Sequence, residues 1–178
     1  MLMNLSELGA LTYLVLLALI FAQSAWHKAN DYGRFLGLVA NYRLVPGFIE
    51  EGVSRTLIAA EILLVILLIF PVTAVFASLS AGVLLLVYAG AMGVNLIRGN
   101  QLIDCGCGGR AQPVSWLLVL RNLVLASCAL LPLTFDASQP SKIELTVALL
   151  AGAVLWLAYN LSGKIIENNR RLSSIRQF

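Results

Sequence analysis

Two cysteines separated by one residue, Cys105 and Cys107, form the pattern in this sequence that is best suited to chemistry. They lie in a run at residues 105–109 that reads CGCGG. A disulfide between them would close a very small ring, and departure from relaxed disulfide geometry makes such a bond easier to reduce. Strained, accessible disulfides are typically labile, regulatory or catalytic, and glycine allows the backbone angles that a small ring demands. The pattern therefore predicts a site for thiol–disulfide exchange.

Three other interpretations of the cysteine pair stay open: a structural staple, half of a metal site and a chance occurrence. A tetrahedral zinc site needs four ligands, and the remaining candidates are His27 and Cys128. Cys128 lies about 14 residues, or roughly 20 Å, along the helix expected after the loop, so it is better explained as a small buried hydrophobe. We predict that the chain alone binds no metal or other cofactor, and that a quinone or metal is reached only through a partner.

The scaffold that must position the cysteines is a membrane bundle. Hydrophobic residues make up 60% of the chain, charged residues make up 12%, and the mean hydropathy is +0.88. These values lie outside the range of soluble globular proteins. The net charge of only +3, with basic residues beside apolar runs, argues against a nucleic-acid partner and for the lipid bilayer. We predict an all-α integral membrane protein, a bundle of about five transmembrane helices with a four-helix core plus one.

The expected spans follow from uncharged runs and prolines. They cover residues 8–26, about 53–70, about 73–97, 114–133 and about 143–162. Pro71 separates the second span from the third, and Pro113 is expected to open the fourth. The opening MLMNLSELG has no Lys or Arg, so the first run is interpreted as a retained helix rather than a signal peptide.

Two polar segments complete the expected organisation. In residues 29–52, apolar side chains recur at helical spacing, which predicts a short interfacial amphipathic helix that ends at Pro46-Gly47 and covers the bundle. Residues 164–178 are expected to form a basic cytoplasmic tail after a single transmembrane domain at residues 1–163.

The distribution of basic residues predicts the orientation. With five spans, one face carries Lys28, Arg34, Arg43, Arg55, Arg98, Arg110, Lys164, Arg170, Arg171 and Arg176, and the other carries Lys142. Lys and Arg are enriched in cytoplasmic loops. We therefore expect a bacterial inner membrane protein whose Cys-x-Cys loop lies on the cytoplasmic face.

Two charged residues, Glu61 and Arg121, lie inside predicted spans at matching depths of roughly 11 to 12 Å from the cysteine-bearing face. A charge in a bilayer usually faces the bundle interior with a partner, so we expect these two to pair. A polar pocket beneath the cysteine loop is predicted from them together with Asn122, Asn95, Gln23, Ser24 and His27. The pair could serve the site directly or simply hold two helices together. His27 could anchor its helix at the headgroups or exchange protons with a thiol.

These residues together resemble one known family. His27-Lys28 at the end of a helix, a helix with Glu61, and RGNQLIDCGCGG followed by VSWLLVLRN are similar to the MauE family of methylamine-utilisation membrane proteins, within the DoxX-like group. The resemblance spans roughly residues 10–130 and points to Cys105, Cys107, Glu61, Arg121 and Asn122. It implies a thiol–disulfide role beside a thioredoxin-like protein in maturing or supporting a partner enzyme. It also implies a partner outside the cytoplasm, whereas the charge count places the loop inside.

Two hypotheses of function follow. In the first, the chain is a thiol–disulfide oxidoreductase that passes electrons to or from a thioredoxin-like partner. In the second, it is a non-catalytic accessory or assembly subunit of a larger membrane complex. Its lack of a second cysteine pair keeps the second hypothesis open, because quinone-linked thiol oxidases generally use two pairs.

Overall fold

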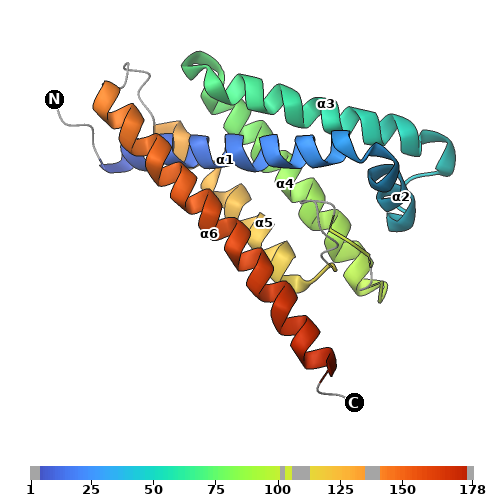
Figure 1. Ribbon diagram of the computed structural model, residues 1–178. Helices are drawn as coiled ribbons and strands as arrows, with labels where there is room; N and C mark the ends of the chain where they lie inside the picture. Colours follow the sequence, from blue (N-terminus) through green and yellow to red (C-terminus); the bar gives the residue numbers. More distant parts are fainter. Residues whose placement is uncertain (1–4, 101–102, 106–112, 135–140, 176–178) are drawn as a thin grey trace.

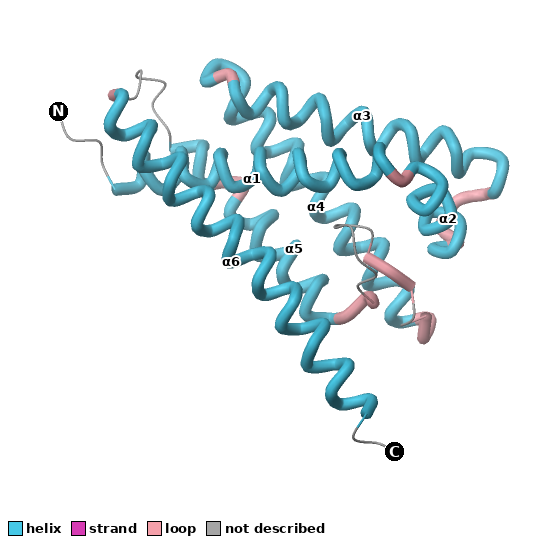
Figure 2. The backbone as a smooth tube through the Cα atoms, viewed as in Figure 1, coloured by secondary structure: helices cyan, strands magenta, loops and turns pink. Residues whose placement is uncertain are grey.

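The computed structural model describes residues 5–100, 103–105, 113–134 and 141–175, and nearly all of them are helical (Figures 1 and 2). The elements in chain order are α1 (Leu5–Asn30), α2 (Tyr32–Tyr42), η1 (Gly47–Ile49), α3 (Glu50–Ile69), α4 (Pro71–Ile97), α5 (Trp116–Cys128), η2 (Leu131–Thr134) and α6 (Lys142–Ile175). Within the described residues the extended structure is limited to one isolated bridge between Asp104 and Pro113. The prediction of an all-α fold is confirmed.

Five stretches are long and apolar enough to cross a membrane: Leu5–Asn30, Gly47–Ile69, Pro71–Ile97, Trp116–Leu133 and Lys142–Ile165. They match the five predicted spans, so the chain is a multi-pass membrane protein. Phe70 has an extended backbone and Pro71 begins α4, which places the predicted break between the second and third spans correctly. Proline suits this first helical position because the amide it lacks would have no intrahelical acceptor there.

The start of α5 differs from the prediction. Pro113 does not open the helix but pairs with Asp104 in the isolated bridge, and the amide of Val114 donates to the Ile103 carbonyl at 2.9 Å. The helix begins at Trp116, and Ser115 caps it by accepting from the Leu118 amide. A serine cap satisfies an amide at the helix start, which a proline cannot do with its own side chain.

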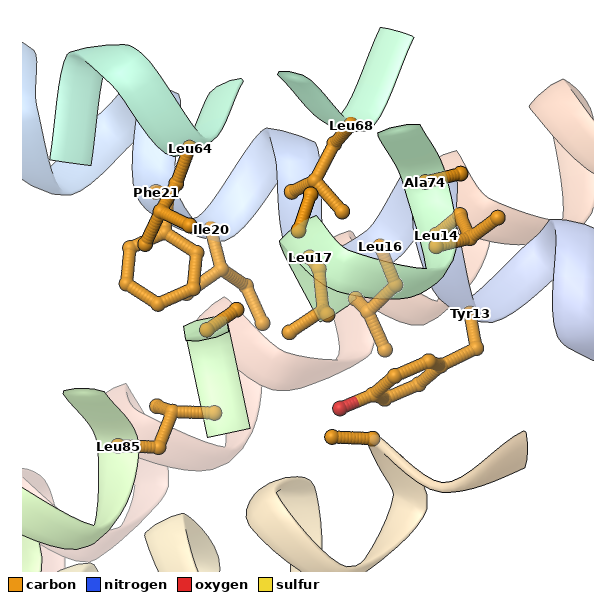
Figure 3. Packing of buried hydrophobic residues seen from close by; sticks show 13 residues of the cluster. Tyr13, Leu14, Leu16, Leu17, Ile20, Phe21, Leu64, Leu68, Ala74 and Leu85 are labelled. Carbon is orange, nitrogen blue, oxygen red and sulfur yellow. The ribbon is translucent and has the colours of Figure 1, made fainter. Parts of the chain in front are cut away.

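The core is built around α1. This helix packs against α3 and α6, and α4 packs against α3 and α5. Leucines of α1 and α3 meet beside Phe21 and Leu85 in the interior (Figure 3). Only 11% of the spanning window of α6 is buried, against 39% for α1, so α6 is the peripheral helix beside a four-helix core.

Small residues allow two of these helix pairs to approach closely. A Cβ at Gly152 would lie 2.5 Å from Val15 Cγ1, and a Cβ at Gly82 would lie 2.8 Å from the Ala129 Cβ. Such small residues are typical of contacts between membrane helices, where association depends on close packing. The first contact fixes α6 on α1, and the second fixes α5 on α4.

The predicted amphipathic helix is present as α2 and lies across the end of α1 (Figure 1). Asp31 caps its start by accepting from the Arg34 amide, and Arg43, with φ of 49°, ends it just before Pro46. The last helix, α6, runs through Lys164 to Ile175 without a break, so the expected basic tail begins inside a helix.

Candidate functional site

The buried carboxylate of Glu61 is the centre of a polar cluster between three helices. Glu61 lies on α3 and is 0% exposed. Its Oε1 accepts hydrogen bonds from Lys28 Nζ at 2.5 Å, from Tyr88 Oη at 2.8 Å and from Ser24 Oγ at 3.0 Å. Ser24 and Lys28 come from α1 and Tyr88 comes from α4. A buried carboxylate needs an opposite charge and hydrogen bonds, and this cluster supplies both.

Lys28 is the cation of this cluster and is only 4% exposed. Its ammonium forms the ion pair with Glu61 and also donates to Tyr88 Oη at 3.0 Å. The same nitrogen lies 4.5 Å from the centre of the Tyr88 ring and 5.0 Å from that of Phe35 on α2. Aromatic faces attract cations, and the attraction strengthens when water is excluded. Lys28 thus ties α1, α2, α3 and α4 together at one point.

The predicted pairing of Glu61 with Arg121 is wrong. The Arg121 guanidinium lies 4.4 Å over the Tyr159 ring of α6, and its Nε has no hydrogen-bond partner. The helices that carry the two residues are not extensively packed on each other: α3 contacts α1, α2 and α4, whereas α5 contacts α4. Matching depth gave no information on which faces of the two helices meet, and Lys28 on α1 lies nearer to the carboxylate.

The other residues of the predicted polar pocket separate into several places. Ser24 does join Glu61, but Gln23 Nε2 donates to Asn160 Oδ1 of α6 at 2.9 Å. Asn95 Nδ2 donates to the carbonyl of Tyr42 at 3.2 Å and so links α4 to the end of α2. The prediction of one polar pocket beneath the cysteine loop is therefore wrong, because these amides serve different helix contacts.

Two predicted site residues lie apart from the cluster. Asn122 is buried at 2% exposure, and its Nδ2 has no hydrogen-bond partner. The His27 side chain is half-buried, and within the described part of the chain its imidazole has no hydrogen bond or ion pair. The structure does not bring either of them to Glu61.

Cys105 follows a segment, Ile103 and Asp104, that is held at the end of the bundle, whereas Cys107 lies outside the described residues. Asp104 accepts a hydrogen bond from Arg34 at 3.1 Å through its carboxylate and one from Tyr42 Oη at 3.3 Å through its carbonyl. Both donors belong to α2. Asp104 also forms the isolated bridge to Pro113, just before α5 begins. The backbone that leads into the Cys-x-Cys loop is thus fixed to α2.

An apolar cavity of about 270 Å³ joins Cys105 to the polar cluster. Lys28 and Tyr88 line it together with Cys105, and the rest of the wall is almost entirely aliphatic or aromatic. Its walls come from α2, α3 and α4, for example Phe35, Leu38, Val53, Leu57, Val87 and Ala91. The thiol of Cys105 and the buried ammonium of Lys28 therefore line the same cavity.

Three contributors to this site were not identified from the sequence: Lys28, Tyr88 and Asp104. A lysine at the end of a span is typical of a topology signal, yet Lys28 lies one helical turn from Ser24 on the same face of its helix, and this spacing is contained in the sequence. In the described ranges no group of three or more His, Cys, Asp or Glu could hold a metal ion. Cys128 packs against the main hydrophobic core, as expected.

Comparison with known proteins gives a consistent result over most of the chain. Residues 6–135 match the family model of the methylamine utilisation protein MauE. A MauE of Paracoccus denitrificans is 42% identical over 149 residues, covering 82% of this chain and 80% of the relative. MauE of Paracoccus versutus is 39% identical with coverage of 80% and 79%, and that of Methylorubrum extorquens is 35% identical with 82% and 81%. No solved structure matches significantly.

Proposed function

The chain belongs to the MauE family, and from that premise we propose that it is a membrane thiol–disulfide exchange protein that supports methylamine utilisation. The relatives carry methylamine utilisation in their names. The observation that carries the proposal is the position of Cys105, which is fixed by its neighbour Asp104 to α2 and lines a cavity with Lys28. Cys105 thus packs against the apolar cluster at this end of the bundle and also faces the cavity that the Lys28 ammonium lines.

The proposed chemistry is exchange between the Cys105–Cys107 pair and a thioredoxin-like partner. A thiolate of the reduced protein attacks the disulfide of the oxidised one, and a mixed disulfide forms as one partner sulfur leaves as a thiolate. The second thiol of the attacking protein then displaces the partner. Two electrons and two protons pass between the two proteins, so the exchange needs no further reactant.

The buried cluster supports this site by fixing its surroundings. The Lys28–Glu61 ion pair joins α1 to α3, and both Lys28 and side chains of α3 line the cavity next to Cys105. Because the Glu61 carboxylate balances the charge of Lys28, an ammonium group lines the cavity while the cluster as a whole carries no net charge. We assign Glu61 and Lys28 a positioning role, and we place the Cys-x-Cys loop at the cytoplasmic face of a bacterial inner membrane on the distribution of basic residues.

Serine substitutions test the proposal and separate it from the assembly hypothesis. Cys105→Ser and Cys107→Ser are compared with Cys128→Ser, which replaces a cysteine of the hydrophobic core away from the loop. We expect the first two to abolish support of methylamine utilisation while the protein stays in the membrane at normal abundance, and the third to retain it. Full function in the Cys105→Ser and Cys107→Ser variants would overturn exchange and favour an accessory subunit. Loss of bound metal in those two variants would indicate metal handling instead.

A further inference from the structure

The cavity beside Cys105 has the properties of a binding site for a small apolar molecule with one polar end. Its volume of about 270 Å³ corresponds to on the order of nine water volumes, which is enough for a substituted six-membered ring. Its walls are hydrophobic apart from Lys28 and the hydroxyls of Tyr42 and Tyr88. Ligand sites commonly combine an apolar surface with a few convergent polar groups.

The polar end of such a ligand is indicated by the Lys28 ammonium. An ammonium has three N–H donors, and within the described residues Lys28 donates to two oxygens, those of Glu61 and Tyr88. The third N–H of the Lys28 ammonium is therefore left for an acceptor inside the cavity, which Lys28 lines. The charge of Lys28 is already balanced by Glu61, so a neutral oxygen such as a carbonyl fits better than an anionic headgroup, which would bring an unpaired charge into an apolar space.

The route into the cavity is apolar as well. Val87 on α4 lines the cavity and is 55% exposed on the outer surface of a membrane-spanning helix, and Leu44 at its edge is 41% exposed. The cavity therefore reaches the surface that faces lipid. A molecule dissolved in the bilayer could enter from the side, whereas a water-soluble ligand would have to cross this apolar surface.

We infer that this cavity binds a lipid-soluble quinone, with one quinone carbonyl accepting a hydrogen bond from Lys28 Nζ. The choice of an electron-accepting headgroup rests on the proposed thiol function, because Cys105 lines the same cavity. A dithiol that transfers two electrons and two protons to a quinone becomes a disulfide and leaves a quinol, so the step balances. This places the quinone on the chain itself, which differs from the expectation that one is reached only through a partner.

Direct binding tests the inference without measuring exchange. Labelled decylubiquinone is titrated into the purified full-length protein in detergent, with correction for partition into empty micelles. We expect saturable binding of one molecule per chain. Leu57→Trp fills the cavity and should weaken binding roughly tenfold or more, whereas Leu63→Trp, on the exposed side of the same helix, should leave it unchanged. If Leu57→Trp does not fold, Val39→Phe on α2 serves the same purpose.

The role of Lys28 is isolated by a pair of variants that avoids an uncompensated carboxylate. Glu61→Gln is compared with Lys28→Met/Glu61→Gln, and the second should bind decylubiquinone about tenfold more weakly than the first. Decylbenzene, which has no carbonyl, should compete poorly. Binding that is unsaturable, unaffected by Leu57→Trp, or equally strong for decylbenzene would overturn the inference, the last result indicating an acyl-chain site.

A separate arm distinguishes this inference from the proposed function. Decylubiquinone binding is measured in Cys105→Ser/Cys107→Ser, where we expect it to persist, because serine is close to cysteine in size. Persistent binding together with unchanged function in the cell would leave the quinone site standing and remove the exchange proposal. If well-folded wild-type protein does not bind decylubiquinone, the quinone site is ruled out and the exchange proposal is unaffected.

Discussion

Lys28 and Arg121 are both basic residues inside membrane-spanning helices, but the surroundings of their side chains differ. Lys28 is 4% exposed and has a carboxylate, a phenol and two aromatic rings around its nitrogen. Arg121 is half-buried, lies over one ring, and has an Nε without a hydrogen-bond partner. Among the described residues Lys28 forms an ion pair with Glu61, whereas Arg121 forms none.

The difference shows which contacts allow a charged side chain to be buried in this bundle. A charge that is fully desolvated requires an opposite charge and several hydrogen bonds, and Lys28 has them. Arg121 is only half-buried, and its guanidinium lies over the Tyr159 ring, whose face attracts a cation without an acid. The region around Lys28 is therefore a rigid junction of four helices, and the region around Arg121 is a looser contact of α5 with α6.

The largest expected effect comes from Lys28→Met, which leaves the buried Glu61 carboxylate without its cation. Removal of one partner of a buried ion pair typically costs about 3 to 5 kcal/mol of unfolding free energy. We expect a marked loss of thermal stability and yield in detergent. Arg55→Met breaks an exposed pair with Glu51 on the same bundle and serves as the control, with an expected cost below about 1 kcal/mol. Equal stability of the two variants would contradict the junction described here.

Coupling between Lys28 and Glu61 gives the next largest effect. We expect Lys28→Met/Glu61→Gln to be less destabilised than the sum of the two single variants, with a coupling of about 2 to 3 kcal/mol in a double-mutant cycle. The same cycle on Glu61→Gln and Arg121→Met should be additive to within about 0.5 kcal/mol, because the two side chains do not meet. A strong coupling of Glu61 to Arg121 would restore the pairing predicted from the sequence.

Tyr88→Phe tests the hydrogen bonds of the junction separately from its charges. The ring and its contact with the ammonium stay, but the hydroxyl that bridges Lys28 and Glu61 is lost. Hydrogen bonds to charged groups contribute about 1.5 to 3 kcal/mol, so we expect a loss near the lower value. The measurement is the midpoint of thermal unfolding in detergent, and a midpoint equal to that of wild type would mean that the hydroxyl is dispensable.

The smallest expected effect is that of Arg121→Met. No acid is left uncompensated, and the lost contact with the Tyr159 ring is worth about 0.5 to 1 kcal/mol. We expect stability close to wild type in the same unfolding experiment. A loss as large as that of Lys28→Met would show that Arg121 has a second charged partner in the membrane.

The sequence predicted the membrane spans well and the side-chain contacts poorly. Uncharged runs and Pro71 determine where helices cross and break, and the apolar spacing in residues 29–52 indicates α2. Which helix is peripheral does not follow from these patterns and comes from the low burial of α6. Glu61 was correctly expected to need a cation, but the choice between Lys28 and Arg121 depends on helix rotation, which depth along a span does not contain. A charge at the end of an uncharged run usually lies at the membrane surface, so the local sequence predicts that place for Lys28. Its burial depends on a glutamate 33 residues later.

The cysteine loop illustrates the same limit at shorter range. The Cys-x-Cys pattern is local and predicts thiol chemistry by itself, whereas the fixing of Asp104 by Arg34 and Tyr42 joins residues that are 70 and 62 positions apart. Pro113 suggested a helix start by its type, but the neighbouring Ser115 provides the cap. Contacts of this kind follow from how α2 folds back over the bundle end.

The redox state of the Cys105–Cys107 pair is the measurement that tests thiol exchange most directly. Purified protein is equilibrated at a series of glutathione poises and alkylated, and the mass of the loop peptide reports how many thiols remain. We predict a two-electron transition between dithiol and disulfide within the range that thioredoxin-like proteins cover, roughly −120 to −270 mV. A loop peptide that retains both thiols at every poise would contradict exchange by this pair.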